Sequence, residues 1–131
     1  MMVVDTSALV AILKAEAEAA ALLHCLGESR NSTIAMPTLL EVQMVMVSQV
    51  GDAGLVDLEL LLSRAEIRPL AFDANHLRWA LHGWHYYGKG RHRAGLNFGD
   101  CFSYGLAMAL DRPLLFKGDD FSQTDVKVAV F

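Results

Sequence analysis

Five carboxylates occupy similar positions along the chain, each a short distance beyond an apolar segment. They are Asp5, Glu41, Asp100, Asp119 and Asp120. Carboxylates held close together repel one another, and some of them take up protons at neutral pH unless a cation neutralises the group. A site made only of oxygen ligands suits Mg²⁺ or Mn²⁺ better than zinc. The pattern therefore predicts a divalent metal site built from these acids.

Each acid also has a purely structural interpretation. Asp5 could cap a helix, Asp100 could be a first-turn residue that favours the helix dipole, and the stretch GDDF could be an ordinary turn. Glu41 could occupy a surface position of its helix. However, the apolar stretch around it, TLLEVQMVMV, leaves little exposed surface, and an unpaired buried carboxylate is costly. The shared placement of the acids favours a metal site over several coincidences.

A basic segment precedes one of these acids. Lys89, Arg91 and Arg93 lie within GKGRHRAG, and the glycines around them predict a mobile loop. Taken alone, the segment is typical of a solvated charged loop. Beside the acids, it offers a local positive patch to a phosphate backbone, although the net charge of the chain is -4.

Short apolar runs alternate with longer helical patterns, and these elements must position the acids. The predicted strands are residues 2–5, 32–37, 67–72, 113–116 and 126–131. The predicted helices are residues 6–14, 16–26, 38–50, 53–65, 74–88 and 98–111. Thr6 or Ser7 is expected to cap the first helix, Gly27 to end the second, and Asp73 and Asn97 to cap the last two.

This alternation predicts an α/β protein. It indicates a three-layer fold with a central, mainly parallel sheet of about five strands and helices on both faces. Pro69 favours an edge position for the third strand because proline cannot donate to a ladder. In such sheets ligands bind beyond the carboxyl ends of the strands, so acids from four distant segments are expected to meet on one rim.

Composition places the chain among compact domains. With 131 residues, 53% of them hydrophobic and 20% charged, it is expected to form a single domain, residues 1–131. No apolar run is long enough to span a membrane, and no signal-peptide pattern is present at the start. Cys25 and Cys101 lack metal-binding spacing and are expected to be buried free thiols. We expect a cytoplasmic protein without membrane contact.

Several motifs resemble those of PIN-domain proteins, specifically VapC-type toxin ribonucleases of type II toxin–antitoxin pairs. The matching stretches are VVDTSALVAIL, LLEV, GKGRHRAGLNFGDCFSYGLA and PLLFKGDDFSQTD, which cover nearly the whole chain in the family's order. The resemblance implies a small, dimeric, metal-dependent endoribonuclease that is inhibited by a cognate antitoxin. It assigns Asp5, Glu41 and Asp100 to metal coordination and favours Asp120 over Asp119 as the fourth acid.

Residue chemistry and resemblance together predict catalysis by the four acids with Mg²⁺ or Mn²⁺. The ion polarises the scissile phosphate and activates water, while the basic loop attracts the RNA backbone. The predicted substrate-binding residues are Lys89, Arg91, Arg93, Thr6 and Asn97. The number of ions is left open.

Two other functions are considered. A phospho-accepting receiver domain also combines an α/β sheet, Mg²⁺ and a lysine after a late strand, here Lys117. Its accepting aspartate normally ends the third strand, and this chain has no acid near residue 70. The other alternative is a non-catalytic, metal-dependent RNA-binding module, which cleavage assays with and without a chelator distinguish from an enzyme.

Residues 38–65 carry more leucine, valine and methionine than one core-facing stripe of each helix requires. Part of this apolar surface is therefore expected to contact another molecule. Self-association into a homodimer could cover some of it. The resemblance implies a second cover, an amphipathic antitoxin helix that lies in a groove.

Overall fold

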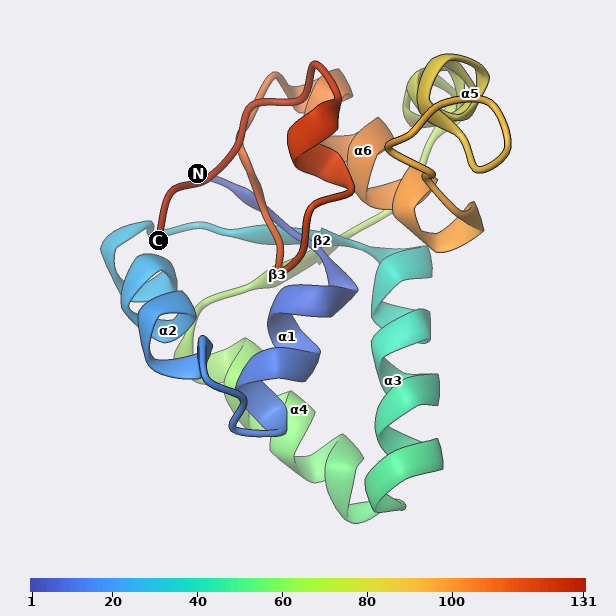
Figure 1. The fold of residues 1–131 in the computed structure, drawn as a ribbon. Helices are drawn as coiled ribbons and strands as arrows, with labels where there is room; N and C mark the ends of the chain where they lie inside the picture. The colour runs from blue at the N-terminus through green and yellow to red at the C-terminus, as the bar shows by residue number, and fades with distance from the viewer.

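The computed structural model describes all residues 1–131, which fold around a small parallel sheet (Figure 1). Its strands are β1 (Val3–Val4), β2 (Thr33–Ala35), β3 (Arg68–Leu70) and β4 (Leu114–Leu115). All neighbouring pairs are parallel, and the order across the sheet is β3-β2-β1-β4. The predicted parallel sheet is confirmed, and β3 lies at an edge, as Pro69 indicates.

The sheet has four strands rather than about five. Residues 126–131 were predicted to form a strand, but they pair with β4 only through an isolated bridge between Leu114 and Val128. The N–H of Leu114 donates to the carbonyl of Lys127 over 2.8 Å, and the N–H of Ala129 donates to Leu114 over 3.0 Å. Because β4 is only two residues long, it offers no further partner on this side.

Six α-helices and one 3₁₀ helix complete the fold. They are α1 (Thr6–Leu13), α2 (Ala19–Glu28), α3 (Met36–Val50), α4 (Ala53–Arg64), α5 (Ala74–Tyr87), α6 (Phe98–Leu110) and η1 (Phe121–Gln123). The predicted start of the second helix at residue 16 is wrong because Ala15 adopts a left-handed conformation, with φ of 53°, and turns the chain there. Gly27 does not end α2 but lies inside it, in open space.

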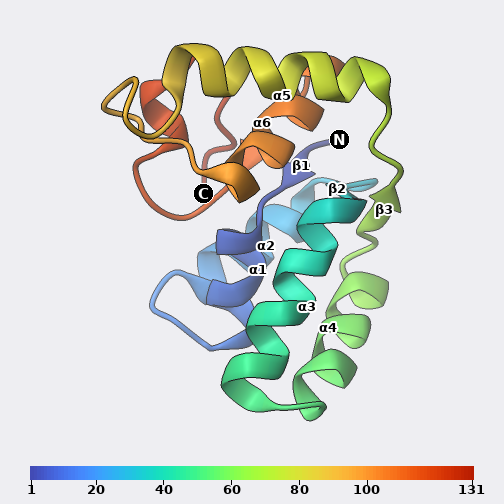
Figure 2. The same cartoon turned by 90° about the vertical axis from the view of Figure 1, so that its right-hand side faces the viewer.

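The sheet separates two hydrophobic cores, as a three-layer fold requires. Val4, Ile34 and Leu115 point to the side covered by α1 to α4. Val3 and Leu114 point to the other side, which α5, α6 and the C-terminal segment cover. Figures 1 and 2 show these two helical layers on opposite faces of the strands. This alternation fixes which strand residues face each core, and it leaves the strand ends to carry the polar groups.

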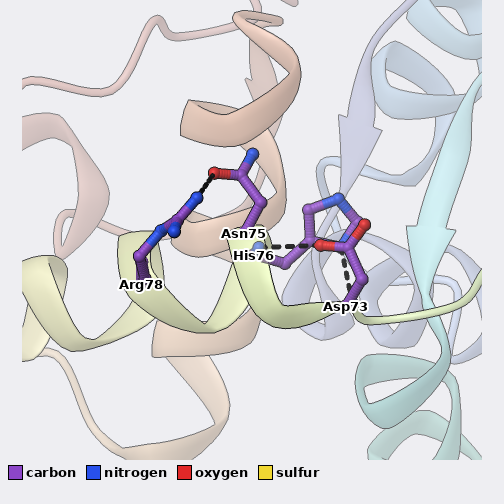
Figure 3. A network of polar contacts seen from close by, with 4 residues as sticks. All are labelled: Asp73, Asn75, His76 and Arg78. Atoms are coloured by element: carbon purple, nitrogen blue, oxygen red, sulfur yellow. Dashed lines mark hydrogen bonds and ion pairs between the residues drawn. The ribbon is translucent and has the colours of Figure 1, made fainter.

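Side-chain caps set where three helices begin. Asp5, rather than Thr6 or Ser7, caps α1 by accepting from the N–H of Ser7. Asn97 caps α6, and Asp73 caps α5, as predicted. In α5 the carboxylate of Asp73 accepts from the N–H of His76 over 3.0 Å, while the His76 ring accepts from the N–H of Asp73 over 3.1 Å (Figure 3).

Two further expectations concern the thiols and the membrane. Both cysteines are free, as predicted. Cys101 is buried, whereas Cys25 is only half-buried, with its Sγ 3.6 Å from the carbonyl oxygen of Val130. None of the six α-helices combines the length and hydropathy that a membrane crossing requires.

Candidate active site

The carboxyl ends of the inner strands and the starts of three helices meet on one rim. Asp5 follows β1 directly, Glu41 lies in the second turn of α3, and Asp100 lies in the first turn of α6. Asp119 and Asp120 lie in the loop after β4. Helix α3 packs against both α1 and α6, which brings these segments together (Figure 2).

The carboxylate of Asp5 is buried and held from two directions. Only 3% of the residue is exposed. Its Oδ2 accepts from the N–H of Ser7 over 3.1 Å and from the hydroxyl of Ser7 over 2.7 Å. Its Oδ1 accepts from the hydroxyl of Ser103, in α6. These hydrogen bonds stabilise a charged group that burial alone would disfavour.

Glu41 reaches the rim from α3 and contacts the starts of two other helices. Its Oε1 accepts a hydrogen bond from the hydroxyl of Thr6. On its other side the carboxylate lies against the backbone of Gly99, where a Cβ atom would lie only 2.9 Å from Cδ of Glu41. The side chain of Thr6, predicted to bind substrate, therefore already binds Glu41.

Asp100 carries the clearest electrostatic mark of the site. Burial raises the pKa of its carboxyl to about 7, and the negative charges of Asp5, Asp120 and Glu41 raise this pKa further, against the hydrogen bond from the backbone of Asn97. That hydrogen bond belongs to a capping box, in which the N–H of Asn97 donates to Asp100 Oδ2 over 3.1 Å and the N–H of Asp100 donates to Asn97 Oδ1 over 2.8 Å.

The two acids after β4 differ in their surroundings. Asp120 is among the charges that raise the pKa of Asp100, and Asp119 is not. Both residues are exposed, and Asp120 stands at the start of η1. The carbonyl of Asp119 accepts from the hydroxyl of Ser122 over 2.8 Å, which fixes the turn.

The donor set fits a hard divalent cation in its chemistry, although the acids are not closed around one point. No three histidine, cysteine, aspartate or glutamate side chains come close enough together to surround one ion. The groups are all carboxylates and hydroxyls, and the raised pKa of Asp100 indicates negative charge without a local counterion. A cation would remove this repulsion and draw the carboxylates together.

The basic loop is more firmly attached than its glycines suggest. Arg91 donates from Nε to the carbonyl of His85 over 2.9 Å, and its guanidinium lies 4.7 Å from the ring centroid of Trp84. By contrast, Lys89 and Arg93 are exposed, and their side chains make no hydrogen bond or ion pair. The structure leaves these two cations available for an anionic ligand. Asn97 uses its Oδ1 in the helix cap.

Sequence reasoning missed Ser7, Ser103 and Gly99. Ser7 accepts from the N–H of Lys117 over 3.0 Å while its hydroxyl donates to Asp5, so it joins the loop after β4 to β1. Ser103 could have been suspected because it lies three residues after Asp100, on the same face of a helix. The role of Gly99 depends on the approach of α6 to α3, which local sequence does not specify.

The large hollows lie away from the acids. One of about 830 Å³ lies at the amino ends of β2 and β3, the rim opposite to the acids. A second, of about 420 Å³, is a groove between α1, α2 and α4, lined by the apolar residues Ile12, Leu13, Leu23, Leu60 and Leu61. Helix α3 also has an exposed stripe, the α3 stripe, made of Met36, Leu40, Met44 and Val47. The surplus apolar surface predicted for residues 38–65 is therefore present.

Comparison with known proteins identifies the family. The model of the PIN domain matches residues 2–127 of the chain. This match covers nearly the whole chain, and the acids described above lie within it. The chain therefore belongs to the PIN-domain family.

Curated relatives are similar over almost their whole length. The chain is 47% identical over 125 residues to the "Ribonuclease VapC" of Mycolicibacterium smegmatis, with 95% of this chain and 97% of that protein covered. It is 44% identical over 125 residues to "Ribonuclease VapC30" of Mycobacterium tuberculosis, with 95% of each chain covered. The resemblance inferred from the motifs is confirmed.

Solved structures share the fold at low identity. VapC20 of Mycobacterium tuberculosis, described as a toxin that cleaves the sarcin-ricin loop, matches with a TM-score of 0.79 at 17% identity, covering 99% of this chain and 98% of that one. A VapBC2 structure from Rickettsia felis, bound to a DNA fragment from its promoter, matches with a TM-score of 0.74 at 18% identity, covering 97% and 95%. These matches support the three-layer fold.

Proposed function

We propose that this chain is a Mg²⁺- or Mn²⁺-dependent endoribonuclease that acts as the toxin of a toxin–antitoxin pair. The observation that carries the proposal is the electrostatic contact of four acids from four separate segments, which raises the pKa of Asp100 to about 7. Curated relatives at 47% and 44% identity are named ribonucleases, which supports RNA as the substrate.

Asp5, Glu41, Asp100 and Asp120 would hold the cation, and Asp119 is the less favoured choice for the fourth place. When bound, the ion supplies Lewis acidity that polarises a phosphate and activates water. Asp100 must lose its proton to take part, and Asp5 is kept in place by the hydroxyls of Ser7 and Ser103.

The basic loop serves the substrate rather than the ion, because lysine and arginine have no free lone pair at neutral pH. Lys89 and Arg93 extend into solvent and bind phosphates of the RNA backbone. Arg91 presents its remaining N–H groups from a fixed position over Trp84. Thr6 and Asn97 reach the substrate only through groups that their contacts with Glu41 and Asp100 leave free.

Two apolar surfaces accept protein partners. The groove between α1, α2 and α4 takes an amphipathic helix of the cognate antitoxin, whose tail extends to the acids. The α3 stripe is covered by a second copy of the chain in a homodimer. The solved VapBC complexes with the same fold support a paired antitoxin, and a cytoplasmic site of action follows from RNA as the substrate.

The receiver-domain alternative is disfavoured by the position of Lys117. Its ammonium lies 3.0 Å from Glu16 and 3.3 Å from Glu18, so it is neutralised away from the acidic rim. A receiver domain needs its lysine beside the phosphorylated aspartate. The alternative of a non-catalytic RNA-binding module makes a different prediction, since it would bind RNA without cleaving it.

Expression in a bacterial host tests the proposal. The wild-type chain should arrest growth and generate new RNA 5′ ends, and Asp100→Asn should do neither. Co-expression with the product of a small neighbouring reading frame should restore growth and yield a stable, inactive complex. A chain that is monomeric, has no co-purifying partner and causes no growth defect would contradict the toxin assignment.

A further inference from the structure

The hydrogen bonds to Asp5 leave its carboxylate only one open position. An ionised carboxylate has two lone-pair sites on each oxygen and can only accept. Oδ2 accepts twice from Ser7, through the N–H and the hydroxyl, at 3.1 and 2.7 Å. Oδ1 accepts once, from Ser103. One lone pair of Oδ1 therefore remains free for another ligand.

The hydroxyl of Ser7 is committed to Asp5 by its other partner. The N–H of Lys117 donates to Ser7 Oγ over 3.0 Å, so this oxygen acts as an acceptor there and turns its hydrogen toward Oδ2. The two contacts with Ser7 thus do not release Oδ2 without breaking the link between α1 and the loop after β4.

Ser103 is unusual in its surroundings. It is completely buried in α6, between apolar neighbours, and its only hydrogen bond through the side chain goes to Asp5 in a different part of the sequence. A buried hydroxyl in a hydrophobic layer is retained without cost only when it is paired. The pairing joins α6, which carries Asp100 one turn earlier, to the end of β1.

We propose that Ser103 is a positioning residue, which fixes Oδ1 of Asp5 so that Asp5 binds a divalent cation through this one oxygen. This inference rests on the proposed function, because it assumes that Asp5 is a metal ligand. Partners that hydrogen-bond to a metal-binding carboxylate orient it, and losing one typically lowers metal affinity 10- to 100-fold. We expect the lower end of this range, about tenfold, because Ser7 still holds Oδ2.

Binding of Mn²⁺ to the purified protein without RNA tests the inference. The free Mn²⁺ remaining at equilibrium is measured by electron paramagnetic resonance for the wild type, Ser103→Ala and Ser32→Ala. Ser32 is a matched control, because it is also completely buried and its hydroxyl donates to the carbonyl of Ser29 over 3.2 Å, far from the acids. Both variants lose one buried hydrogen bond, and only Ser103→Ala should bind Mn²⁺ about tenfold more weakly.

A second variant and a second readout complete the test. Ser103→Cys keeps the shape and a weak donor, so its Mn²⁺ affinity should fall between those of wild type and Ser103→Ala, and it decides the matter if Ser103→Ala does not fold. A crystal structure with Mn²⁺ should show Asp5 bound through Oδ1. Unchanged affinity in the Ser103 variants, or an ion on Oδ2, would overturn the inference alone. A wild type that binds no Mn²⁺ would contradict the proposed function and this inference with it.

Discussion

The backbone of Gly99, at the start of α6, lies directly against the carboxylate of Glu41 in α3. A Cβ atom at position 99 would come within 2.9 Å of Cδ of Glu41 and closer still to one of its oxygens. Only glycine allows this approach. The contact joins two helices on the acidic rim, and it places one candidate ligand by means of a residue that has no side chain of its own.

Replacing Gly99 with alanine should therefore impair activity more than stability. The atoms that a new Cβ would meet belong to the end of a flexible side chain, so Glu41 can move away while the fold persists. A displacement of about 1 Å in an active site can cost about 100-fold in rate, and we expect a loss of this order in RNA cleavage for Gly99→Ala. Gly27→Ala is the control, because position 27 has open space and should lose no activity.

The raised pKa of Asp100 makes stability depend on pH in the absence of metal. The pKa of this carboxyl is about 7 in the folded chain against an ordinary value of 3.8, so the folded state holds the proton more tightly than the unfolded state. The free energy of unfolding should fall as the pH rises from about 4 to about 7, and then level off. After allowance for the partial exposure of Asp100, the loss is about 2 kcal/mol.

Urea unfolding in EDTA at several pH values measures this effect. Asp100→Asn removes the titrating group, so the difference between wild type and this variant isolates it from other carboxylates. We expect the variant to be the more stable protein above pH 7 and to lose this part of the pH dependence. Parallel pH curves for the two proteins would mean that Asp100 does not titrate in this range.

Asp120→Asn should reduce cleavage more than Asp119→Asn. The charge of Asp120 acts on Asp100, whereas that of Asp119 does not, and the neighbouring positions make the two variants a matched pair. We expect a loss of about tenfold or more in cleavage and in Mn²⁺ affinity for Asp120→Asn, and little change for Asp119→Asn. Full activity in both variants would remove this loop from the site.

Lys89 and Arg93 should contribute to RNA affinity through phosphate contacts. Replacing both with glutamine should reduce the slope of log affinity against log salt by about 1.4, that is, about 0.7 per contact with a single strand. Arg91→Gln should reduce the slope less than the pair and lower the melting temperature as well, because Arg91 also binds His85. Arg30→Gln, near the opposite rim, is the control, and an equal slope for wild type and the double variant would exclude phosphate contacts by the loop.

Local sequence predicted the elements that carry the acids because strand ends and helix caps depend on short-range chemistry. Asp73 and Asn97 are good caps in any context, and Pro69 is confined to an edge by its missing N–H. Asp5 could be placed on a rim because it directly follows a buried pair of valines. Its role as the cap of α1 was considered only as an alternative, and the structure gives it this role.

Contacts that depend on tertiary packing were not predictable. The hydrogen bond between Ser103 and Asp5 spans 98 residues and exists only because α6 crosses the end of β1 at a particular rotation. The C-terminal segment was expected to form a strand from its alternating valines. Its pairing is limited by the length of β4, which its own sequence does not reveal.

Cleavage of RNA by the purified chain with and without metal tests the central claim most directly. The wild type should cleave in Mg²⁺, stop in excess EDTA and resume when Mg²⁺ is restored. Asp100→Asn should remain folded by circular dichroism and cleave at least about 100-fold more slowly. Wild-type cleavage that persists in excess EDTA, or an Asp100→Asn variant as active as wild type, would contradict metal-dependent catalysis by the acidic rim.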